Sequence, residues 1–375
     1  MEKYIPEALF YLFLFCFVVQ MGFLLFQQRR LAAYKLPVQD LSSVNLPVSV
    51  IISARNETDN LTKYLPAILE QNYPQFEVVV VNDCSVDNSH HILKDFAKNY
   101  PHLKMVTVTE HPRFKTGKKF ALTMGIKAAA YEHLLFTDAD CQPASPSWIA
   151  HMAANFTGGT EIVLGYSPYI KTSGFLNAFT RFETLKTGIN YLSAALGRNA
   201  YMGIGRNLAY TKSLFFRCKG FASHLHILAG DDDLFVNRNA TPENTVIEIH
   251  PDSFTYTEAK TTLGSYIRQK KRHMGVGKLY KSNHRRMLSL DAITGLIFYI
   301  TLFAAIFIVQ PPFLYIIAAA YLLRLLTQVI IYQKSAKKLT GKGLIWFLPF
   351  YDLLHNVYLI VFGLIGTFIK TTQWK

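Results

Sequence analysis

The chain has 375 residues, of which 50% are hydrophobic and only 17% charged, which indicates a membrane-embedded part beside at least one sizeable domain. The 14% aromatic content excludes a disordered or collagen-like protein, and four cysteines without a CxxC pair disfavour a disulfide framework or a zinc site. A formal charge of +14 indicates an anionic partner, which is a nucleic acid, a lipid surface or a phosphorylated substrate.

The first apolar stretch, residues 5–26, is long enough to cross a bilayer core of roughly 30 Å as a helix. A cleaved signal peptide would need a basic start and a small-residue cleavage site, and this stretch has neither. Arg29, Arg30 and Lys35 follow it, so the positive-inside rule places the next part of the chain in the cytoplasm. We therefore expect residues 1–45 to be a retained anchor and linker.

Two further apolar runs, 292–309 and 313–332, are separated by a short uncharged turn at residues 310–312 and predict a membrane hairpin. Basic residues flank the hairpin on both sides, so both of its ends are expected in the cytoplasm. The sequence thus predicts an integral protein of the cell or plasma membrane, with a transmembrane region at 287–375 and the intervening domain cytoplasmic.

Residues 344–369 are a third C-terminal candidate, which either spans the membrane or lies in its interface. Charged groups inside a span are costly and usually face a protein interior. Arg324 and Asp352 are therefore expected to pair across the bundle, with snorkelling to the surface as the alternative.

Short β-branched runs alternate with helical patterns between residues 46 and 141. This alternation predicts an α/β fold with a doubly wound, mostly parallel sheet, whose ligands bind beyond the carboxyl ends of the strands. The expected strands are 48–53, 77–81, 103–108 and 133–137. The expected helices are 59–71, 89–100 and one that follows residue 119 and runs to about 131.

Acidic residues stand at these strand ends. Asp83 ends the second strand, where a turn or helix cap is the simplest interpretation. Asp138 and Asp140 follow the fourth strand, and two carboxylates at this spacing in an extended segment point the same way. Mg²⁺ and Mn²⁺ prefer carboxylate and phosphate oxygens, so we expect a divalent cation here rather than a solvated turn.

Two later segments carry unusual charge. Asp231, Asp232 and Asp233 are adjacent, and like-charge neighbours raise a carboxyl pKa towards the range useful for a general base; a solvated helix start is the alternative. Residues 260–286 hold nine basic residues and no acidic one, which suits an interfacial helix on anionic lipid or a phosphate contact. A nucleic-acid site is disfavoured because this run adjoins the membrane hairpin and no recognised binding module is present.

Taken together, these segments resemble the family 2 inverting glycosyltransferases, which use nucleotide sugars and have the GT-A fold. The resemblance covers about residues 46–280, and its motifs occur in the family's order. They are VSVIISARNE (48–57), VVVVNDCSVDNS (78–89), TGKKFAL (116–122), FTDADC (136–141), GRNLAY (205–210) with KGF (219–221), GDDDLFVNR (230–238) and RQKKRH (268–273). His273 stands where the family's Gln-x-x-Arg-Trp motif usually has Trp.

The resemblance implies roles for particular residues. Asp232 is the expected catalytic base, supported by Asp231, and Asp140 is the expected metal ligand, with Asp138. The residues expected to contact the nucleotide sugar are Ala54, Arg55, Glu57, Asp83, Lys118 and Asp138. The residues expected on the diphosphate or acceptor side are Gln269, Arg272 and His273.

The implied domains are a catalytic GT-A domain at 46–259, with a nucleotide-binding half (46–141) and an acceptor half (142–259), and a basic interfacial segment at 260–286. The membrane layout is similar to that of ceramide glucosyltransferases and of hyaluronan and cellulose synthases. We therefore expect a metal-dependent transferase that moves a sugar, with a UDP-sugar as donor, to a lipid or lipid-linked glycan.

Three alternatives remain at this stage. A processive polysaccharide synthase that translocates its product is the nearest, although it would need a larger bundle. A nucleotidyltransferase is disfavoured because its phosphate loop is usually Gly-rich, and residues 54–57 contain no Gly. A non-catalytic membrane scaffold with a nucleotide-binding fold is disfavoured because both acidic motifs are intact.

Overall fold

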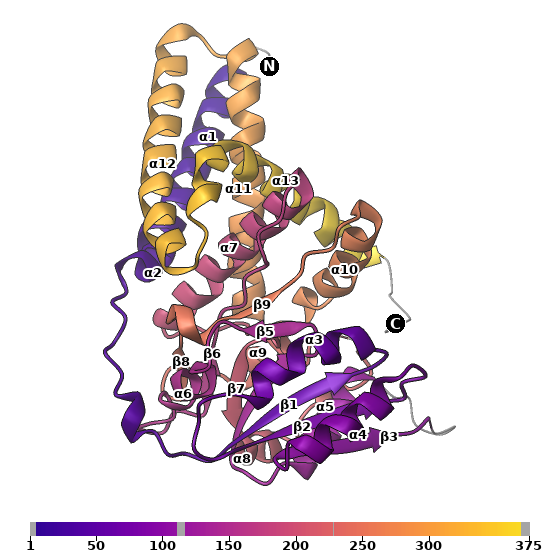
Figure 1. The fold of residues 1–375 in the computed structure, drawn as a ribbon. Helices are drawn as coiled ribbons and strands as arrows, with labels where there is room; N and C mark the ends of the chain where they lie inside the picture. Colours follow the sequence, from indigo (N-terminus) through magenta and orange to yellow (C-terminus); the bar gives the residue numbers. More distant parts are fainter. Residues whose placement is uncertain (1–4, 111–116, 228, 369–375) are drawn as a thin grey trace.

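A computed structural model describes residues 5–110, 117–227 and 229–368, with the side chains of 272–274 and 364–368 outside the description. Its centre is a seven-stranded sheet in the order β3-β2-β1-β4-β7-β6-β8 (Figure 1). Neighbours from β3 to β4 are parallel, β7 is antiparallel to β4 and β6, and β8 is parallel to β6. The strands are β1 (Val48–Ala54), β2 (Phe76–Asp83), β3 (Leu103–Val108), β4 (His133–Asp138), β6 (Ile162–Leu164), β7 (Leu208–Thr211) and β8 (Thr245–Ile247).

The predicted mostly parallel sheet is confirmed, with each expected strand found within two residues of its predicted bounds. Successive side chains of a strand face opposite sides of a sheet, so the apolar run of β1 supplies two cores. Ile51 joins the core on the side of α5 and α7, whereas Val50 and Ile52 join the core beneath α3 and α6. Burial on both faces explains why the strand is continuously apolar rather than alternating.

Helices cover both faces of the sheet, and a two-stranded ribbon of β5 (Cys141–Pro143) and β9 (Thr255–Thr257) lies beside it. The predicted helix to residue 131 ends earlier, at 128, because Ala129 has an extended backbone. The helices of this part are α3 (Thr58–Leu69), α4 (Ser89–Asn99), α5 (Lys118–Ala128), α6 (Trp148–Ala153), α7 (Phe175–Leu196), α8 (Lys212–Arg217), α9 (Asp233–Asn239) and α10 (Leu263–Met274).

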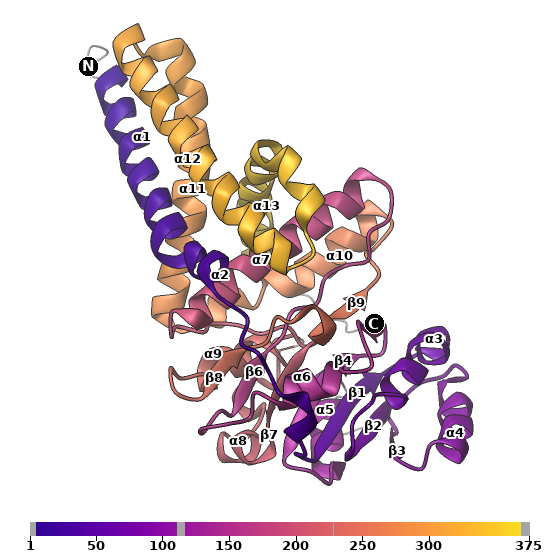
Figure 2. The same cartoon turned by 60° about the vertical axis from the view of Figure 1, so that its left-hand side comes forward.

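Three long helices run side by side as a bundle that projects from the sheet domain (Figures 1 and 2). They are α1 (Ile5–Gly22), which continues through a π-helical turn into α2 (Arg29–Ala33), α11 (Ser282–Ile308) and α12 (Pro311–Lys338). The start of α1 and the turn between α11 and α12 lie at the far end of the bundle, and the other helix ends lie against the sheet domain (Figure 1). The predicted hairpin is thus confirmed, and its two ends lie on the same side as the end of the first span.

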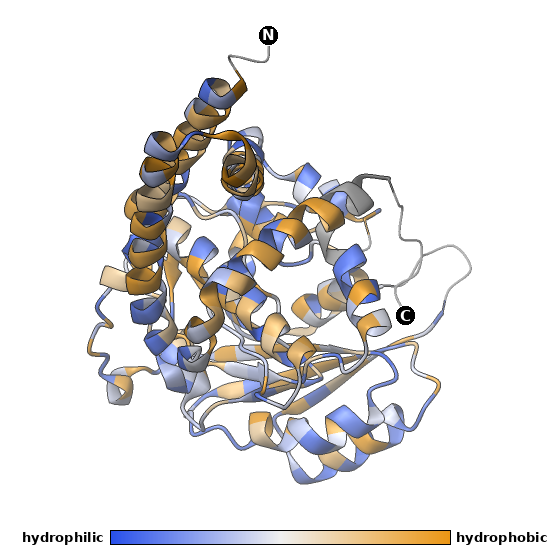
Figure 3. Ribbon diagram, turned by 90° about the horizontal axis from the view of Figure 1, so that it is seen from above, coloured by the Kyte–Doolittle hydropathy of each residue, from blue (hydrophilic) through white to orange (hydrophobic). Residues whose placement is uncertain are grey.

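Large apolar side chains face outwards along the bundle, including Phe26, Phe307 and Tyr315, and the hydrophobic colouring is concentrated on these helices (Figure 3). Four helical segments are long and apolar enough to cross a membrane: 5–33, 282–308, 311–338 and 342–363. The fourth overlaps α13 (Leu348–Phe368), which lies between the bundle and helices α7 and α10 rather than alongside the other three (Figure 2).

The predicted pairing of Arg324 with Asp352 is confirmed, at 3.1 Å between Nη2 and Oδ2, with both side chains buried. Asp352 also accepts hydrogen bonds from Tyr299 Oη and from Lys186 Nζ of α7, and Arg324 donates to Gln20 of α1. Removing one partner of a buried ion pair typically costs about 3–5 kcal/mol. This network therefore fastens the bundle and α13 to a helix of the sheet domain.

Candidate active site

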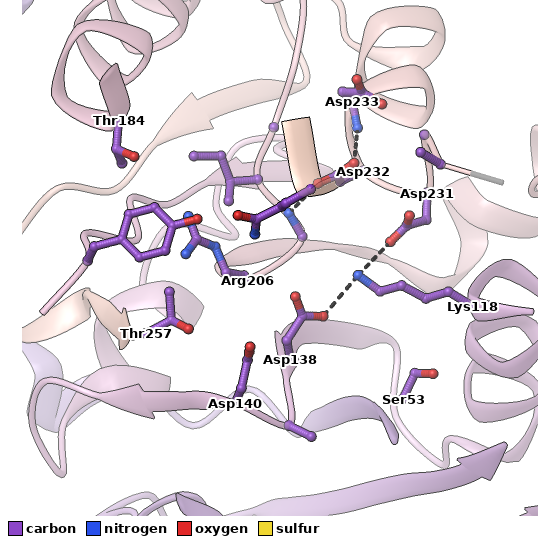
Figure 4. A pocket seen from close by; sticks show the side chains of 18 of the residues that line it. Ser53, Lys118, Asp138, Asp140, Thr184, Arg206, Asp231, Asp232, Asp233 and Thr257 are labelled. Carbon is purple, nitrogen blue, oxygen red and sulfur yellow. Dashed lines mark hydrogen bonds and ion pairs between the residues drawn. The ribbon is translucent and has the colours of Figure 1, made fainter. Parts of the chain in front are cut away.

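A cavity of about 350 Å³ lies at the carboxyl ends of β1 and β4, under α7 and α10. Ser53 and Asp138 line it from the strand ends, and Asp231, Asp232 and Asp233 line it from the start of α9. This is where a doubly wound sheet binds its ligands. The polar residues that follow β1 and β4 therefore line one cavity together with the aspartate triplet (Figure 4), whereas Asp83 at the end of β2 does not line it.

The Asp138 and Asp140 carboxylates stand on the floor of the cavity, one at the end of β4 and the other in the turn that leads to β5. Burial, and then the neighbouring Asp138, raise the pKa of Asp140, while Arg206 opposes this effect. Desolvation and a like charge both disfavour the ionised form of a carboxyl. A positive charge bound next to Asp138 and Asp140 would therefore stabilise their ionised forms.

Lys118, the first residue of α5, lies between the two acidic groups of the cavity. Its Nζ is 2.9 Å from Asp138 Oδ1 and 3.0 Å from Asp231 Oδ2 (Figure 4). Burial alone would lower the pKa of Lys118, but Asp138, Asp231 and Asp232 together hold it well above its ordinary value. The lysine therefore stays charged and links the floor of the cavity to the acidic triplet.

The Asp232 carboxylate is fixed by two backbone amides. Asp232 Oδ2 accepts from Gly205 N and Oδ1 accepts from Asp233 N, both at 2.7 Å. Asp232 is also the N-cap of α9. The helix start that the sequence offered as an alternative for the aspartate triplet is therefore present, but the Asp232 side chain lines the cavity. Burial, and then Asp231, raise the pKa of Asp232, as expected for a carboxylate that is to accept a proton.

Asp233 is held from another direction. Its Oδ2 accepts a hydrogen bond of 2.8 Å from Tyr280 Oη, and its Oδ1 accepts from Leu234 N. Burial, and then Asp232, raise the pKa of Asp233 to about 8. The raised pKa favours the protonated form of Asp233, which would reduce the negative charge beside Asp232.

A divalent cation fits the donor set on the cavity floor. Asp140 and Asp138 supply hard carboxylate oxygens, and the open cavity above them leaves room for phosphate oxygens, which Mg²⁺ and Mn²⁺ combine with few protein ligands. One Asp138 oxygen is already paired with Lys118, which favours Asp140 as the main metal ligand. The resemblance to the family implied the same choice.

Another possible ligand group lies elsewhere. Among the His, Cys, Asp and Glu side chains of the described residues, one group of three lies close enough together to share a metal ion: His151, His250 and Asp252. The two imidazole rings stack, with centroids 4.1 Å apart and an interplanar angle of 13°, so the lone pairs of the two rings lie in nearly parallel planes. His151 Nδ1 also lies 2.8 Å from Gln39 Oε1, and none of the three lines the cavity.

The expected nucleotide contacts divide into two groups. Arg55, Glu57 and Lys118 line the cavity, as does Asp138. Ala54 does not, because the alternation along β1 turns its side chain into the core and leaves Ser53 at the cavity.

Asp83 also lies outside the cavity lining and is fully buried. Neither of its oxygens meets a nitrogen or oxygen donor in the described part of the chain, and burial raises its pKa. A buried carboxylate left without such donors suits a ligand that brings its own, so the predicted nucleotide contact at Asp83 stays a prediction.

On the acceptor side, Gln269 lines the cavity, and its buried Oε1 has no hydrogen-bond partner among the described residues. The side chains of Arg272 and His273 lie outside the described residues. Lys270 of the basic segment 260–286 is buried and forms an ion pair with Glu183 of α7 in the cavity wall, so it is not one of the charges that could face the membrane.

Some cavity residues were not predicted from the sequence. Arg206 lies over the Tyr169 ring, with 4.6 Å between its guanidinium carbon and the ring centroid, and it faces the Asp138/Asp140 pair. Its place in the GRNLAY motif was the available signal. Glu183, Thr184 and Thr187 of α7 also line the cavity, and three polar residues at helical spacing in a mostly apolar helix would have indicated them.

Comparison with known proteins supports the expected fold and the expected family resemblance. Residues 49–222 match the family model of glycosyl transferase family 2. The poly-β-1,6-N-acetyl-D-glucosamine synthase of Staphylococcus epidermidis is 36% identical over 159 residues, which are 39% of this chain and 37% of the relative. The glycosyltransferase AglE of Haloferax volcanii is 32% identical over 173 residues, 45% of this chain and 52% of the relative.

The chain thus spans about half or less of the length of these relatives. Among solved structures, the mannosyltransferase PcManGT of Pyrobaculum calidifontis, in complex with GDP-Man and Mn²⁺, is similar over 93% of this chain and 99% of its own. Its TM-score is 0.58 at 18% sequence identity, a likeness of fold. The expected resemblance to the family 2 glycosyltransferases is confirmed over residues 49–222, and the sheet domain has the GT-A fold.

Proposed function

We propose that this protein is a membrane-bound enzyme that transfers a sugar, with inversion, from a nucleoside diphosphate sugar to a lipid or lipid-linked glycan. The observation that carries the proposal is a single cavity with an acidic pair on its floor, an acidic triplet opposite and Lys118 between them. A UDP-sugar is the proposed donor.

The donor side supplies charge for the leaving group. Asp140 and Asp138 would hold Mn²⁺ or Mg²⁺, which neutralises negative charge on the departing diphosphate when bound. Arg55 at the rim of the cavity and Lys118 inside it add positive charge of the protein's own. Arg272 is proposed to contact the diphosphate or the acceptor, as the family motif implies.

The acceptor side supplies the base. Asp232 takes the proton from the acceptor hydroxyl as the hydroxyl oxygen forms a bond to the anomeric carbon of the donor sugar. The bond from that carbon to the diphosphate oxygen breaks at the same time, and the diphosphate leaves with the bonding electron pair. Attack opposite the leaving group inverts the configuration of the anomeric carbon. The two backbone amides on Asp232 fix its direction for this step.

The cavity wall next to the membrane helices supports an acceptor from the bilayer. Thr184 and Thr187 come from α7, and Gln269 comes from α10, and both of these helices contact α13. Their polar side chains suit the head group of a lipid whose tail stays in the membrane. The β-monoglucosyldiacylglycerol synthase of Nostoc, which by its name makes a glycolipid, is 33% identical over 100 residues, or 26% of this chain.

A polysaccharide synthase that translocates its product is the second candidate, because the Staphylococcus epidermidis relative is by its name a polysaccharide synthase. The described part of the chain offers four candidate spans, and Gln20, Arg324 and Asp352 are joined by hydrogen bonds in the bundle core, where a polymer channel would need open space.

Nucleotide-sugar hydrolysis tests the proposal directly. The purified protein is expected to hydrolyse one member of a panel of UDP- and GDP-sugars slowly, faster with Mn²⁺ than with chelator, because water can replace the acceptor hydroxyl. The measurement is release of the nucleoside diphosphate. Absence of turnover and of binding for every donor would contradict the proposal and favour a scaffold.

Topology is the second prediction. Single cysteines at Lys94 and Lys337, exposed on the side of the sheet domain, should resist an impermeant thiol reagent in intact cells. A cysteine at Gln310, in the turn at the far end of the bundle, should react rapidly and serves as the matched control. The background must lack the four native cysteines. Rapid labelling at Lys94 and Lys337 with protection at Gln310 would reverse the proposed orientation.

A further inference from the structure

Hydrogen bonds join α9, which begins just after Asp232, to the residues that open the membrane helix α11. Tyr280 Oη donates to Asp233 Oδ2 at 2.8 Å, and Lys281 N donates to Asn237 Oδ1 at 2.8 Å. Asn237 Nδ2 in turn donates to the Tyr201 carbonyl at 2.7 Å. The first and the fifth residues of α9 are therefore both tied to the segment that enters the bundle.

The contact between α9 and the residues before α11 is buried, and it extends to His284 within α11. The exposed fraction is 9% for Tyr280, 1% for Asn237 and 3% for His284. His284 Nδ1 lies 3.0 Å from Asn237 Nδ2, and its Nε2 lies 2.9 Å from Asn199 Oδ1. Hydrogen bonds shielded from water hold geometry more firmly than exposed ones. None of these three side chains lines the cavity, so any effect on catalysis must pass through another group.

That group is Asp232. Its Oδ1 accepts from Asp233 N, and Asp233 is the residue that Tyr280 holds. On the opposite side, Asp232 Oδ2 accepts from Gly205 N in the segment before β7. The carboxylate is thus fixed from the sheet by Gly205 and from the membrane side through Asp233 and Tyr280.

We propose that Tyr280 is a positioning residue for the catalytic base, and that through it the start of membrane helix α11 sets where Asp232 stands. The inference rests on the proposed function, in which Asp232 is the base. An acceptor held by the membrane then meets a base whose position is fixed by a helix of the same membrane region. The sheet domain alone would not position Asp232 relative to the membrane region, because Gly205 binds only one of the two carboxylate oxygens.

The test is Tyr280→Phe, which removes one hydroxyl group and keeps the ring. We expect kcat for sugar transfer to fall about 10–100-fold, because a misplacement of roughly 1 Å can cost about 10²-fold in rate. The KM and Kd for the nucleotide sugar should stay unchanged, since Tyr280 does not line the cavity. A merely structural role would lower the amount of folded enzyme without this division between kcat and KM.

Tyr299→Phe is the matched control. Tyr299 Oη also donates to a buried aspartate, Asp352 Oδ2, at 2.8 Å, but in the bundle and away from α9. It should lower Tm by about as much as Tyr280→Phe while leaving kcat per folded molecule at the wild-type value. Both variants are assayed as full chains in detergent or in vesicles, with the folded fraction measured in parallel.

Two results would overturn the inference: a wild-type kcat for Tyr280→Phe, or an equal loss of kcat in Tyr299→Phe. The proposed function fails separately, if the wild-type protein transfers no sugar or if Asp232→Asn stays fully active. Active wild type, inactive Asp232→Asn and normal Tyr280→Phe together would remove only the positioning role.

Discussion

Asp232→Asn is expected to lower kcat for sugar transfer by about 10²–10⁴-fold, or roughly 3–5 kcal/mol of barrier, while donor binding stays nearly intact. The reason is that the base acts on the acceptor proton only in the transition state. The asparagine keeps one oxygen acceptor for the two backbone amides that now bind the carboxylate, so donor affinity and Tm are measured beside the rate.

The neighbouring aspartates provide the matched controls. Asp233→Asn should cost less, because an amide oxygen can still accept from Tyr280 and the raised pKa of Asp233 already favours its neutral form. Asp231→Asn should fall between the two, because it removes one of the two carboxylates bound to Lys118. Near-normal turnover in Asp232→Asn with an inactive Asp233→Asn would show that the base is one residue further along the chain.

Asp140→Asn is expected to abolish turnover and to weaken nucleotide-sugar binding in Mn²⁺. The substitution replaces a carboxylate ligand with a neutral amide and removes half of the negative charge of the pair, which would weaken the hold on the cation that offsets the charge of the diphosphate. Direct Mn²⁺ binding, measured by the loss of the free-ion paramagnetic resonance signal, gives a readout that does not depend on activity.

Glu258→Gln is the control for this variant. Glu258 lines the same cavity, but its carboxylate is paired with Lys63 and Tyr64 on the exposed side, so its loss should leave Mn²⁺ binding unchanged. Full activity of the wild-type enzyme in excess chelator would overturn the metal assignment.

The strands and spans could be predicted because their signals are local. A continuous β-branched run such as residues 78–81 has few stable environments other than a strand buried on both faces. The pairing of Arg324 with Asp352 was also predictable, since two opposite charges in apolar segments have little else to pair with. Lys186, which joins them from α7, gave no such signal because it belongs to the sheet domain.

The site was predictable at the level of motifs but not of side-chain direction. Asp138, Asp140 and the aspartate triplet do line one cavity, as the resemblance of their motifs to the family implies. The side chain of Ala54 faces the core instead of the cavity, because strand alternation is set by register rather than by composition, and its predicted nucleotide contact stays a prediction.

Contacts between residues far apart in the chain, within the cavity wall and behind it, could not be predicted from the sequence. The ion pair of Lys270 with Glu183 and the hydrogen bond of Tyr280 to Asp233 join residues far apart in the chain. Only the packing of α10 and of the start of α11 onto the sheet domain brings these partners together.

The most direct test of the central claim is transfer itself. Membrane vesicles that contain the protein are incubated with radiolabelled UDP-sugars and Mn²⁺, and the label in the lipid extract is counted. We predict label in the extract for one donor with the wild-type protein, and none with Asp232→Asn or with chelator. Label that appears equally with Asp232→Asn, or that is absent for every nucleotide sugar although the protein binds one, would contradict the account.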